Sequence, residues 1–403
     1  MANAELRYRR IVAKFGTALL TGGGHRLDLE VMAGLVGQVA RLRRQRAQVV
    51  VVTSGAIAAG RHRLGSRGRL LGKERRAGPQ ARAGGLPEAE PQARAGRAGQ
   101  EIVTRQALAA VGQSHLMQAY DELFAWHDLT VAQALLTRQD LADRVGYLNA
   151  RNTLLALLEL GAIPIVNEND VVAVDEIEGA KIGDNDNLSA LVAGLVDADL
   201  LALLGDTGGL YTADPRHNAR AQLIPRVERI DDALAEMAGR PGPGGTGGMA
   251  TKLQAAKLAT AGGADVVIAD GREPDVLLRL AGGELLGTWF PAAADPLESR
   301  KRWMLSGLAA RGQVVIDTGA VRALKEQGKS LLPAGVRGVE GAFQRGDVIY
   351  VCDEGEGRVA CGIANYSHQE VRAIQGQRSD RIAHILGYHY GEEIVHRNNL
   401  VLL

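Results

Sequence analysis

Short runs of apolar and often β-branched residues alternate with longer amphipathic segments from residue 10 to about residue 291. This alternation is typical of strands and helices that build one largely parallel sheet. The sequence therefore predicts an α/β fold, with an open, mainly parallel sheet between layers of helices. The expected buried strands are residues 11–15, 49–53, 131–135, 163–166, 200–204 and 266–269.

The alternating pattern stops at residues 291–299, where the segment PAAADPLES precedes a region rich in valine and glycine. Beyond it, the runs VVID, GDVIYVCD and RVACGIANYS are typical of short strands separated by glycine turns. They predict a small, β-rich, barrel-like domain. A chain of 403 residues exceeds the usual size of a single core, so we expect two domains, residues 1–293 and 299–403.

Residues 65–99 are rich in Arg, Ala, Gly, Pro and Gln and show no apolar periodicity, which predicts a disordered insertion. Their basic excess would suit an anion or RNA, although a solvated loop is the commoner outcome for this composition. Across the whole chain, 47 Lys and Arg residues balance 46 Asp and Glu residues. The overall charge therefore gives no reason to expect nucleic acid as a partner.

Two cysteines, Cys352 and Cys361, are too few for a disulfide framework and lack the spacing of a zinc site, so we expect them in the core. The first ten residues carry charges with no apolar stretch behind them, and the apolar residues 154–166 are interrupted by Glu159 and Pro164. We therefore expect no secretory signal and no membrane span. The expected location is the cytoplasm.

Ligands bind outside the carboxyl ends of the strands in open α/β sheets, so the loops after the strands should carry the chemistry. The first loop, KFGTALLTGGG at residues 14–24, places Lys14 at a strand end before small residues that admit an anion. An ordinary turn has the same composition. The second loop, TSGAIAAG at residues 53–60, begins a helix at Ser54, which suits either a ligand contact or a plain N-cap.

Five acidic and amide side chains crowd the region after the fourth strand: Glu168, Asp170, Asp184, Asn185 and Asp186. Crowded carboxylates are costly unless a positive charge compensates them. A bound ammonium group, a lysine or a Mg²⁺ ion would do so, because Mg²⁺ takes oxygen ligands from carboxylates and substrate phosphates. The alternative is a solvated turn in which Asp184 caps a helix.

The segment PGPGGTGGMATK at residues 241–252 brings Thr251 and Lys252 into the start of a helix. Glycines and a lysine at a helix N-terminus suit a polyphosphate. The segment is not a Walker A motif, and residues 242–247 match the dinucleotide glycine pattern without the strand that should precede it. A flexible linker is the alternative interpretation.

Together the four loops supply lysines, backbone amides and carboxylates, without an evident Ser-His-Asp arrangement or thiol nucleophile. This combination favours phosphoryl transfer, which depends on positioning and on neutralising charge. A carboxylate acceptor would need no general base, because it is already ionised at neutral pH.

Seven motifs stand in a fixed order along the chain: KFGTALLT, VVVTSGAIAAG, AVGQSHLMQAYDELF, IPIVNENDVV, KIGDNDNLSALVA, GLYTADPR and GTGGMATKLQAA. With this set the chain resembles the glutamate 5-kinases of the amino acid kinase family, and the region after Ser299 resembles the PUA domain of many bacterial members. The resemblance implies ATP- and Mg²⁺-dependent phosphorylation of the γ-carboxylate of L-glutamate to glutamyl 5-phosphate, the first step of proline biosynthesis.

The resemblance also implies roles for individual residues. Lys14 and Lys252 match lysines that stabilise the transferring phosphoryl group, and Asp186 matches a carboxylate that aligns them. The glutamate-binding positions are Ser54, Asp170, Asp184 and Asn185. The nucleotide is expected against Lys14, Gly205, Asp206, Thr246, Gly247, Gly248, Met249, Ala250, Thr251 and Lys252. The metal ligands stay unassigned.

The chain departs from the family pattern at several positions. Gly205 stands where Thr or Ser is usual, so a side-chain contact to the nucleotide is either absent or replaced by backbone. Ser is commoner at Ala250, and a GSS sequence is commoner at residues 16–18. The insertion at residues 65–99 is not typical of the family.

The resemblance further implies a homo-oligomer and feedback inhibition by proline at or overlapping the glutamate site. The PUA-like domain could modulate the enzyme, extend the oligomer or bind RNA, and composition does not choose among these roles. Because a fold does not determine its acceptor, phosphorylation of acetylglutamate, aspartate or uridylate is an alternative. An RNA-binding accessory protein is a second alternative, based on the PUA-like domain and the basic insertion.

Overall fold

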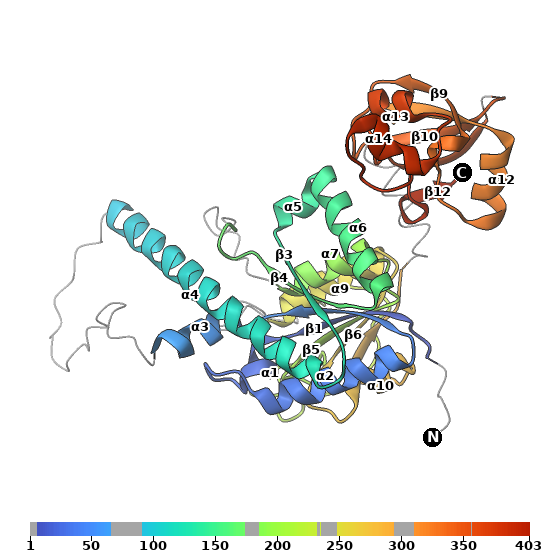
Figure 1. Cartoon of the computed structure of the whole chain (residues 1–403). Coiled ribbons are helices and arrows are strands. Elements are labelled where there is room, and N and C mark those ends of the chain that lie inside the picture. Colours follow the sequence, from blue (N-terminus) through green and yellow to red (C-terminus); the bar gives the residue numbers. More distant parts are fainter. Residues whose placement is uncertain are drawn as a thin grey trace. The chain divides into compact units, whose positions relative to one another are not determined.

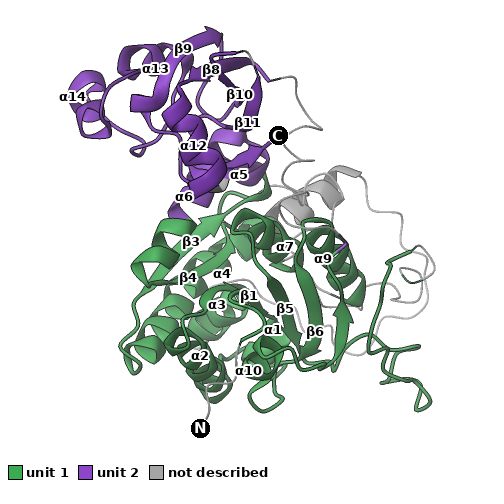
Figure 2. Ribbon diagram, turned by 90° about the vertical axis from the view of Figure 1, so that its right-hand side faces the viewer, with its two compact units in different colours: residues 1–138, 154–292 green, residues 139–153, 293–403 purple. Residues whose placement is uncertain are grey.

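The computed structural model describes residues 6–65, 91–173, 185–231, 234, 248–293, 310–355 and 357–403, apart from the side chains of residues 91–101 and 398. The chain divides into two compact units (Figure 2). The first comprises residues 1–138 and 154–292, and the second comprises residues 139–153 and 293–403. Each unit is described by itself below.

The first unit is built on a sheet with the order β3-β4-β2-β1-β5-β6-β7 among the described strands (Figure 1). All neighbouring strands are parallel except β7, which runs antiparallel to β6. The predicted α/β fold is confirmed, and each expected strand is present. The strands are β1 (Arg10–Phe15), β2 (Gln48–Thr53), β3 (Val131–Leu136), β4 (Ile163–Glu168), β5 (Leu200–Gly205), β6 (Asp265–Asp270) and β7 (Thr288–Phe290).

Helices cover both faces of this sheet. Because side chains alternate along a strand, Ile11, Ala13 and Phe15 of β1 face one core, while Lys14 faces the other side. The core on the Phe15 side is closed by helices α2 (Leu29–Arg44), α10 (Val276–Ala281) and the C-terminal part of α4 (Pro91–Ala125). Helices α7 (Asn185–Leu195) and α9 (Met249–Ala261) pack together on the opposite side (Figure 1). Remaining helices of this unit include α1 (Thr17–Thr21) and α3 (Ala56–Gly65).

Helices α3 and α4 pack at glycine contacts. A Cβ atom on Gly60 would lie 1.9 Å from the carbonyl oxygen of Leu108, and one on Gly112 would lie 1.7 Å from that of Ala56. The two backbones therefore touch, which brings α4 directly against the segment that follows β2. Since α4 begins at Pro91, the structure has a helix in the last part of the segment predicted to be a disordered insertion. The rest of that prediction, residues 66–90, lies outside the described residues.

The second unit contains the predicted β-rich domain, which is confirmed. Its described strands form a sheet with the order β12-β11-β10-β8-β9. Phe343, Tyr366 and Val371 lie in its buried core. The strands are β8 (Gly312–Ile316), β9 (Val336–Gly341), β10 (Val348–Asp353), β11 (Arg358–Ile363) and β12 (Leu400–Leu402), and the helices are α12 (Thr318–Gln327), α13 (His368–Ile374) and α14 (Ile382–Leu386).

Residues 139–153 also belong to the second unit. They include most of α5 (Arg138–Ala142) and the first turns of α6 (Arg144–Leu160). Leu148 is fully buried in a cluster with Val348 and Cys361 of the sheet. Arg151, which is 1% exposed, donates from Nε to Oδ1 of Asn399 at 2.5 Å. Residues 294–309 lie outside the described ones, so the domain boundaries predicted at residues 293 and 299 stay a prediction.

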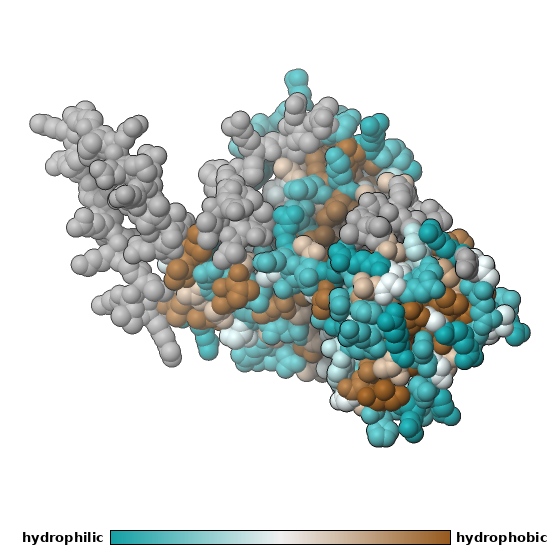
Figure 3. All heavy atoms as spheres, turned by 90° about the horizontal axis from the view of Figure 1, so that it is seen from above, coloured by the Kyte–Doolittle hydropathy of each residue, from teal (hydrophilic) through white to brown (hydrophobic). Residues whose placement is uncertain are grey.

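Both cysteines are free and buried, as expected for core residues. Among the described residues, no helix combines the length and apolar character needed to cross a membrane. Apolar side chains also reach the surface, where Figure 3 shows brown groups among hydrophilic side chains. The most exposed large apolar side chains in the described part of the chain are Leu160, at 82%, and Trp126, at 76%.

Candidate active site

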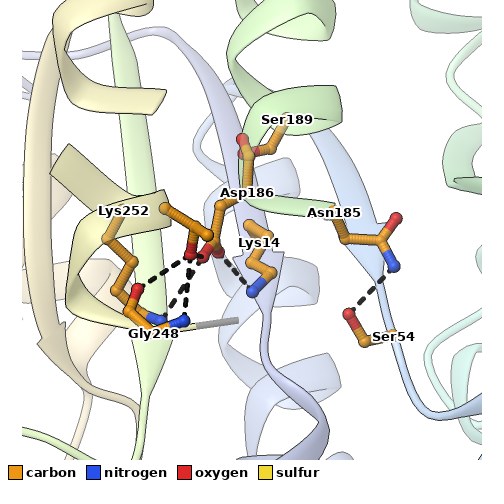
Figure 4. Close-up of polar contacts among 8 residues, drawn as sticks. Lys14, Ser54, Asn185, Asp186, Ser189, Gly248 and Lys252 are labelled. Carbon is orange, nitrogen blue, oxygen red and sulfur yellow. Dashed lines mark hydrogen bonds and ion pairs between the residues drawn. The ribbon is translucent and has the colours of Figure 1, made fainter. Parts of the chain in front are cut away.

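The strand ends predicted to carry the chemistry lie at one edge of the sheet, because β1, β2, β4 and β5 run parallel. At this edge Asp186 lies between two lysines (Figure 4). Its Oδ1 forms an ion pair with Nζ of Lys14, and its Oδ2 lies 3.4 Å from Nζ of Lys252. Three segments far apart in the sequence therefore place two ammonium groups around one carboxylate.

The local folding of each element explains this convergence. Lys14 points to the side of the sheet that α7 and α9 cover, because its neighbours Ala13 and Phe15 point to the other side. Asp186 is the second residue of α7, and Lys252 lies in the first turn of α9. Both helices thus begin at the carboxyl edge of the sheet, where their N-termini favour negative charge.

Thr251 connects the start of α9 to Asp186. Its hydroxyl oxygen accepts a hydrogen bond from the backbone N–H of Gly248 at 3.1 Å. The same oxygen lies 2.8 Å from both Asp186 Oδ2 and the Gly248 carbonyl oxygen, and it donates its proton to one of them. This arrangement fixes the first turn of α9 relative to the carboxylate.

Asp186 is fully buried and stays ionised because of its neighbours. Burial raises the pKa of its carboxyl group, but the charges of Lys14 and Lys252 and hydrogen bonds from Lys14 and Thr251 outweigh that effect. The pKa consequently falls from 3.8 to about 2. The sequence predicted that an ammonium group, a lysine or a Mg²⁺ ion would compensate the crowded carboxylates. At Asp186 the compensating groups are two lysines.

A second polar pair lies beside this cluster. Asn185, the first residue of α7, donates from Nδ2 to the hydroxyl oxygen of Ser54 at 3.1 Å (Figure 4). Ser54 follows β2 and is 8% exposed, and Gly55 continues the chain with a φ of +100° that favours glycine. The structure therefore brings together two residues that the sequence analysis proposed from separate motifs.

Gly205 ends β5 next to the lysines. A Cβ atom there would lie 3.7 Å from Cε of Lys252, an ordinary contact, so the lack of a side chain leaves this side of the lysine open. Asp206 follows and is exposed. Met249 and Ala250 begin α9, and Asp170 lies just after β4. The remaining predicted site residues, Asp184, Thr246 and Gly247, lie outside the described residues.

The chain also matches models of known protein families. The model of the amino acid kinase family matches residues 9–270, and that of the PUA domain matches residues 312–386. This chain belongs to the amino acid kinase family.

Relatives of this amino acid kinase match it from end to end. A protein named glutamate 5-kinase from Dehalococcoides mccartyi is 51% identical over 98% of this chain and 99% of its own length. Proteins of the same name from Herpetosiphon aurantiacus and Shewanella oneidensis are each 48% identical, over 98% and 99% of this chain and equal shares of their own lengths. A UMP kinase structure from Bacillus anthracis covers 71% of this chain and 97% of its own at 15% identity, but its TM-score of 0.45 supports no further conclusion.

The amino acid kinase site offers little to a metal ion by itself. Within the described ranges, no three His, Cys, Asp or Glu side chains gather as a metal site. Both oxygens of Asp186 already face lysines or Thr251. Asp186 is therefore already compensated by protein groups and offers no open oxygen to a metal ion.

Sequence reasoning missed a polar network on the other side of the strand ends. Thr53 contacts the hydroxyl of fully buried Tyr120 at 2.8 Å. Asn167 donates from Nδ2 to Oε1 of Gln113 at 2.7 Å. The motifs IPIVNENDVV and AVGQSHLMQAYDELF contain three of these residues, but no pattern within either motif marks them as partners.

Proposed function

We propose that this chain phosphorylates the γ-carboxylate of L-glutamate with ATP, giving L-glutamyl 5-phosphate and ADP in the first step of proline biosynthesis. The observation that carries the proposal is the pair of lysines around the buried Asp186 at the carboxyl edge of the sheet. The full-length relatives named glutamate 5-kinase support the choice of acceptor.

In the proposed reaction, an oxygen of the γ-carboxylate attacks the terminal phosphorus of ATP, and the bond to the bridging oxygen of ADP breaks. The acceptor is ionised at neutral pH, so no protein base is needed. Lys14 and Lys252 neutralise the charge that spreads over the transferring group and the leaving phosphate. Asp186 holds both lysines in position and is itself kept ionised by them.

The nucleotide is proposed to bind along β5 and α9. The first backbone hydrogen bond of α9 runs from the N–H of Lys252 to the carbonyl oxygen of Gly248. The N–H groups of Met249, Ala250 and Thr251 precede it, so helix geometry leaves them available to phosphate oxygens. Gly205 leaves room beside Lys252, and Asp206 follows at the strand end. Mg²⁺ is proposed to enter as the metal complex of ATP.

Ser54, Asp170 and Asn185 are proposed to bind glutamate. The bond between Asn185 and Ser54 links the end of β2 to the start of α7, so substrate binding and the position of Asp186 depend on the same helix turn. Asp184 and the residues Thr246 and Gly247 are assigned by family resemblance to the substrate and the nucleotide.

The decisive experiment is to trap the acyl phosphate with hydroxylamine in the presence of ATP, Mg²⁺ and L-glutamate. We expect glutamyl hydroxamate from the wild type, and its loss in a folded Lys252→Ala variant. Lys257→Ala is the matched control, because Lys257 lies exposed on the same helix. Wild-type activity with acetylglutamate, aspartate or UMP but not with glutamate would overturn the choice of acceptor.

Family resemblance supports three further proposals: inhibition by proline at or overlapping the glutamate site, assembly into a homo-oligomer, and action in the cytoplasm, where ATP is supplied. Inhibition would appear as a rise in the apparent KM for glutamate when proline is added. The oligomer would appear in light scattering as a mass that is a multiple of one chain. Absence of either effect would remove that proposal without touching the reaction.

RNA binding by the PUA domain is a separate proposal. Its sheet carries Arg358 over the ring of Tyr350, and Arg345 lies over Tyr390, each at 4.0 Å. Arginines and aromatic rings are the side chains that contact single-stranded RNA. We expect binding that weakens steeply with salt, and no retention of RNA in a filter assay at low salt would contradict it.

A further inference from the structure

Gln113 of helix α4 presents a buried amide group whose orientation can be worked out from its neighbours. The backbone N–H of Glu168 donates to Oδ1 of Asn167 at 2.9 Å. A backbone N–H can only donate, so the Nδ2 group of Asn167 must be the atom turned toward Gln113. Gln113 therefore accepts through Oε1, at 2.7 Å, and its Nε2 group points elsewhere.

The Nε2 group of Gln113 is buried and has no hydrogen-bond partner among the described residues. A buried donor without an acceptor is unfavourable, and such groups in native structures call for an explanation. Because Nε2 is shielded from bulk solvent, an acceptor that pairs with it has to be an enclosed water or ligand atom.

A complementary atom lies across the same strand ends. Oδ1 of Asn185 is also buried and has no hydrogen-bond partner in the described part of the chain, while its Nδ2 is held by Ser54. Val52 of β2 pairs with Val166 of β4, so the same register puts Thr53 opposite Asn167. Neighbouring strands lie roughly 5 Å apart, and Ser54 is one residue beyond Thr53 at the same edge of the sheet. Gln113 comes from α4 on one face and Asn185 from α7 on the other, so the two amides flank this edge.

The unpaired N–H donor of Gln113 and the unpaired carbonyl acceptor of Asn185 match the two charged groups on the α-carbon of an amino acid. The α-carboxylate accepts hydrogen bonds, and the α-ammonium group donates them. In the proposed reaction the γ-carboxylate lies near Lys14 at the end of β1. Strand β2 separates β1 from β4, where Asn167 bonds to Gln113 of α4. The α-carboxylate, at the other end of the substrate, is thus the group within reach of Gln113.

We propose that Gln113 is a specificity residue that donates a hydrogen bond from Nε2 to the α-carboxylate of the acceptor, with Asn167 holding its amide in that orientation. This inference rests on the proposed glutamate kinase activity and deepens it. It explains how a site built for phosphoryl transfer selects a free amino acid. A carboxylate at that position distinguishes glutamate from its α-amide, which retains the γ-carboxylate.

The test measures hydroxamate formation from L-glutamate and from its α-amide, isoglutamine, with the full-length enzyme. In Gln113→Met, which removes the donor at similar length, we expect the KM for glutamate to rise about 10- to 100-fold, the effect of losing a charge-assisted hydrogen bond. The KM for ATP should not change. In Gln113→Glu, the preference for isoglutamine over glutamate should rise, because the new carboxylate accepts from the amide and repels the α-carboxylate.

Gln118→Glu is the matched control, because Gln118 is exposed on the same helix and bonds only to Glu122 in the described structure. It should leave both substrates unchanged. A purely structural role for Gln113 would lower the melting temperature and affect both substrates equally. An unchanged preference between glutamate and isoglutamine in Gln113→Glu would therefore overturn the inference alone, and so would an unchanged KM for glutamate in Gln113→Met. Absence of hydroxamate from the wild type would overturn the proposed function as well.

Discussion

Asp186 is the residue whose charge depends most on its neighbours. It is fully buried, and its ionised form persists only because Lys14, Lys252 and Thr251 surround it. Removing one partner of such a group leaves the others buried and uncompensated, which commonly costs about 3–5 kcal/mol. The cluster is therefore both a candidate catalytic centre and a point on which the stability of the first unit depends.

This cluster should make folding stability depend on pH in the acid range. The folded-state pKa of Asp186 is about 2, below its ordinary value of 3.8. A lowered pKa stabilises the folded state above the ordinary pKa, and this contribution is lost as the pH falls from about 4 to about 2. The shift corresponds to about 2 kcal/mol, measurable by urea unfolding over that range.

Asp186→Asn is the variant that isolates this effect. Asparagine keeps the shape of the side chain but cannot ionise. The unfolding free energy of the variant should therefore fall less than that of the wild type as the pH drops from about 4 to about 2, whatever its value near neutral pH. We also expect the variant to lose about 100-fold or more in kcat, because the two lysines lose the charge that holds them. Parallel pH profiles for variant and wild type would show that Asp186 does not titrate as described.

At the scale of elements, the contact between α3 and α4 positions the substrate loop. Gly60 and Gly112 allow the two helix backbones to touch, and α3 begins directly after Ser54 and Gly55. The same helix α4 contributes Gln113 and Tyr120 to the strand ends. A shift of α4 would therefore move several groups of the site at once.

Gly60→Ala should accordingly disturb both stability and substrate binding. Its Cβ would lie 1.9 Å from the Leu108 carbonyl oxygen, which neither backbone can accommodate without moving. We expect a loss of more than about 1 kcal/mol in unfolding free energy, as overpacking usually costs 1–3 kcal/mol, and a raised KM for glutamate.

Gly34→Ala in α2 provides the matched control. A Cβ at Gly34 has no atom within 4 Å, so alanine should stabilise the helix by about 0.5–1 kcal/mol and leave KM unchanged. If Gly60→Ala were as stable as Gly34→Ala, the close approach of α3 and α4 would be wrong.

The elements that the sequence predicted well are those with strong local patterns. Residues 49–52 form a continuous run of valines, which is typical of a parallel strand buried on both faces. Strand β7 was missed, because three residues (Thr288–Phe290) carry no periodicity. The first turns of α4 were also missed, since Pro, Gly and Arg residues there lack an apolar stripe.

The site was predictable only in part for a similar reason. Lys14, Asp186 and Lys252 each follow a recognisable loop pattern, but their meeting point depends on strand order, which no single loop encodes. Gln113 gave no signal, because one glutamine on an amphipathic helix resembles any surface residue. Its importance emerges only from its contact with Asn167.

At the scale of the whole molecule, each described residue of the candidate site comes from the first unit. A chain truncated after residue 292 should therefore retain hydroxamate formation. The truncation would also remove the partners of residues 139–153, including Asn399, which accepts a hydrogen bond from the buried Arg151.

Limited proteolysis tests that consequence. In the truncated chain we expect new tryptic cleavage after Arg144 and Arg151, which the full-length chain protects through Asp347 and Asn399. Loss of activity in a folded truncated chain would indicate that the second unit supplies part of the site. Equal resistance to trypsin in both chains would contradict the packing of residues 139–153.

The packing of residues 139–153 also limits how this protein can exchange parts with others. These residues are encoded between β3 and β4 but fold with a sheet encoded from residue 312 onward. Recombination that replaced only the C-terminal segment would leave Leu148 and Arg151 against a foreign surface. The two stretches of sequence are therefore expected to be inherited and to vary together, and chimeric enzymes should be designed with both taken from the same parent.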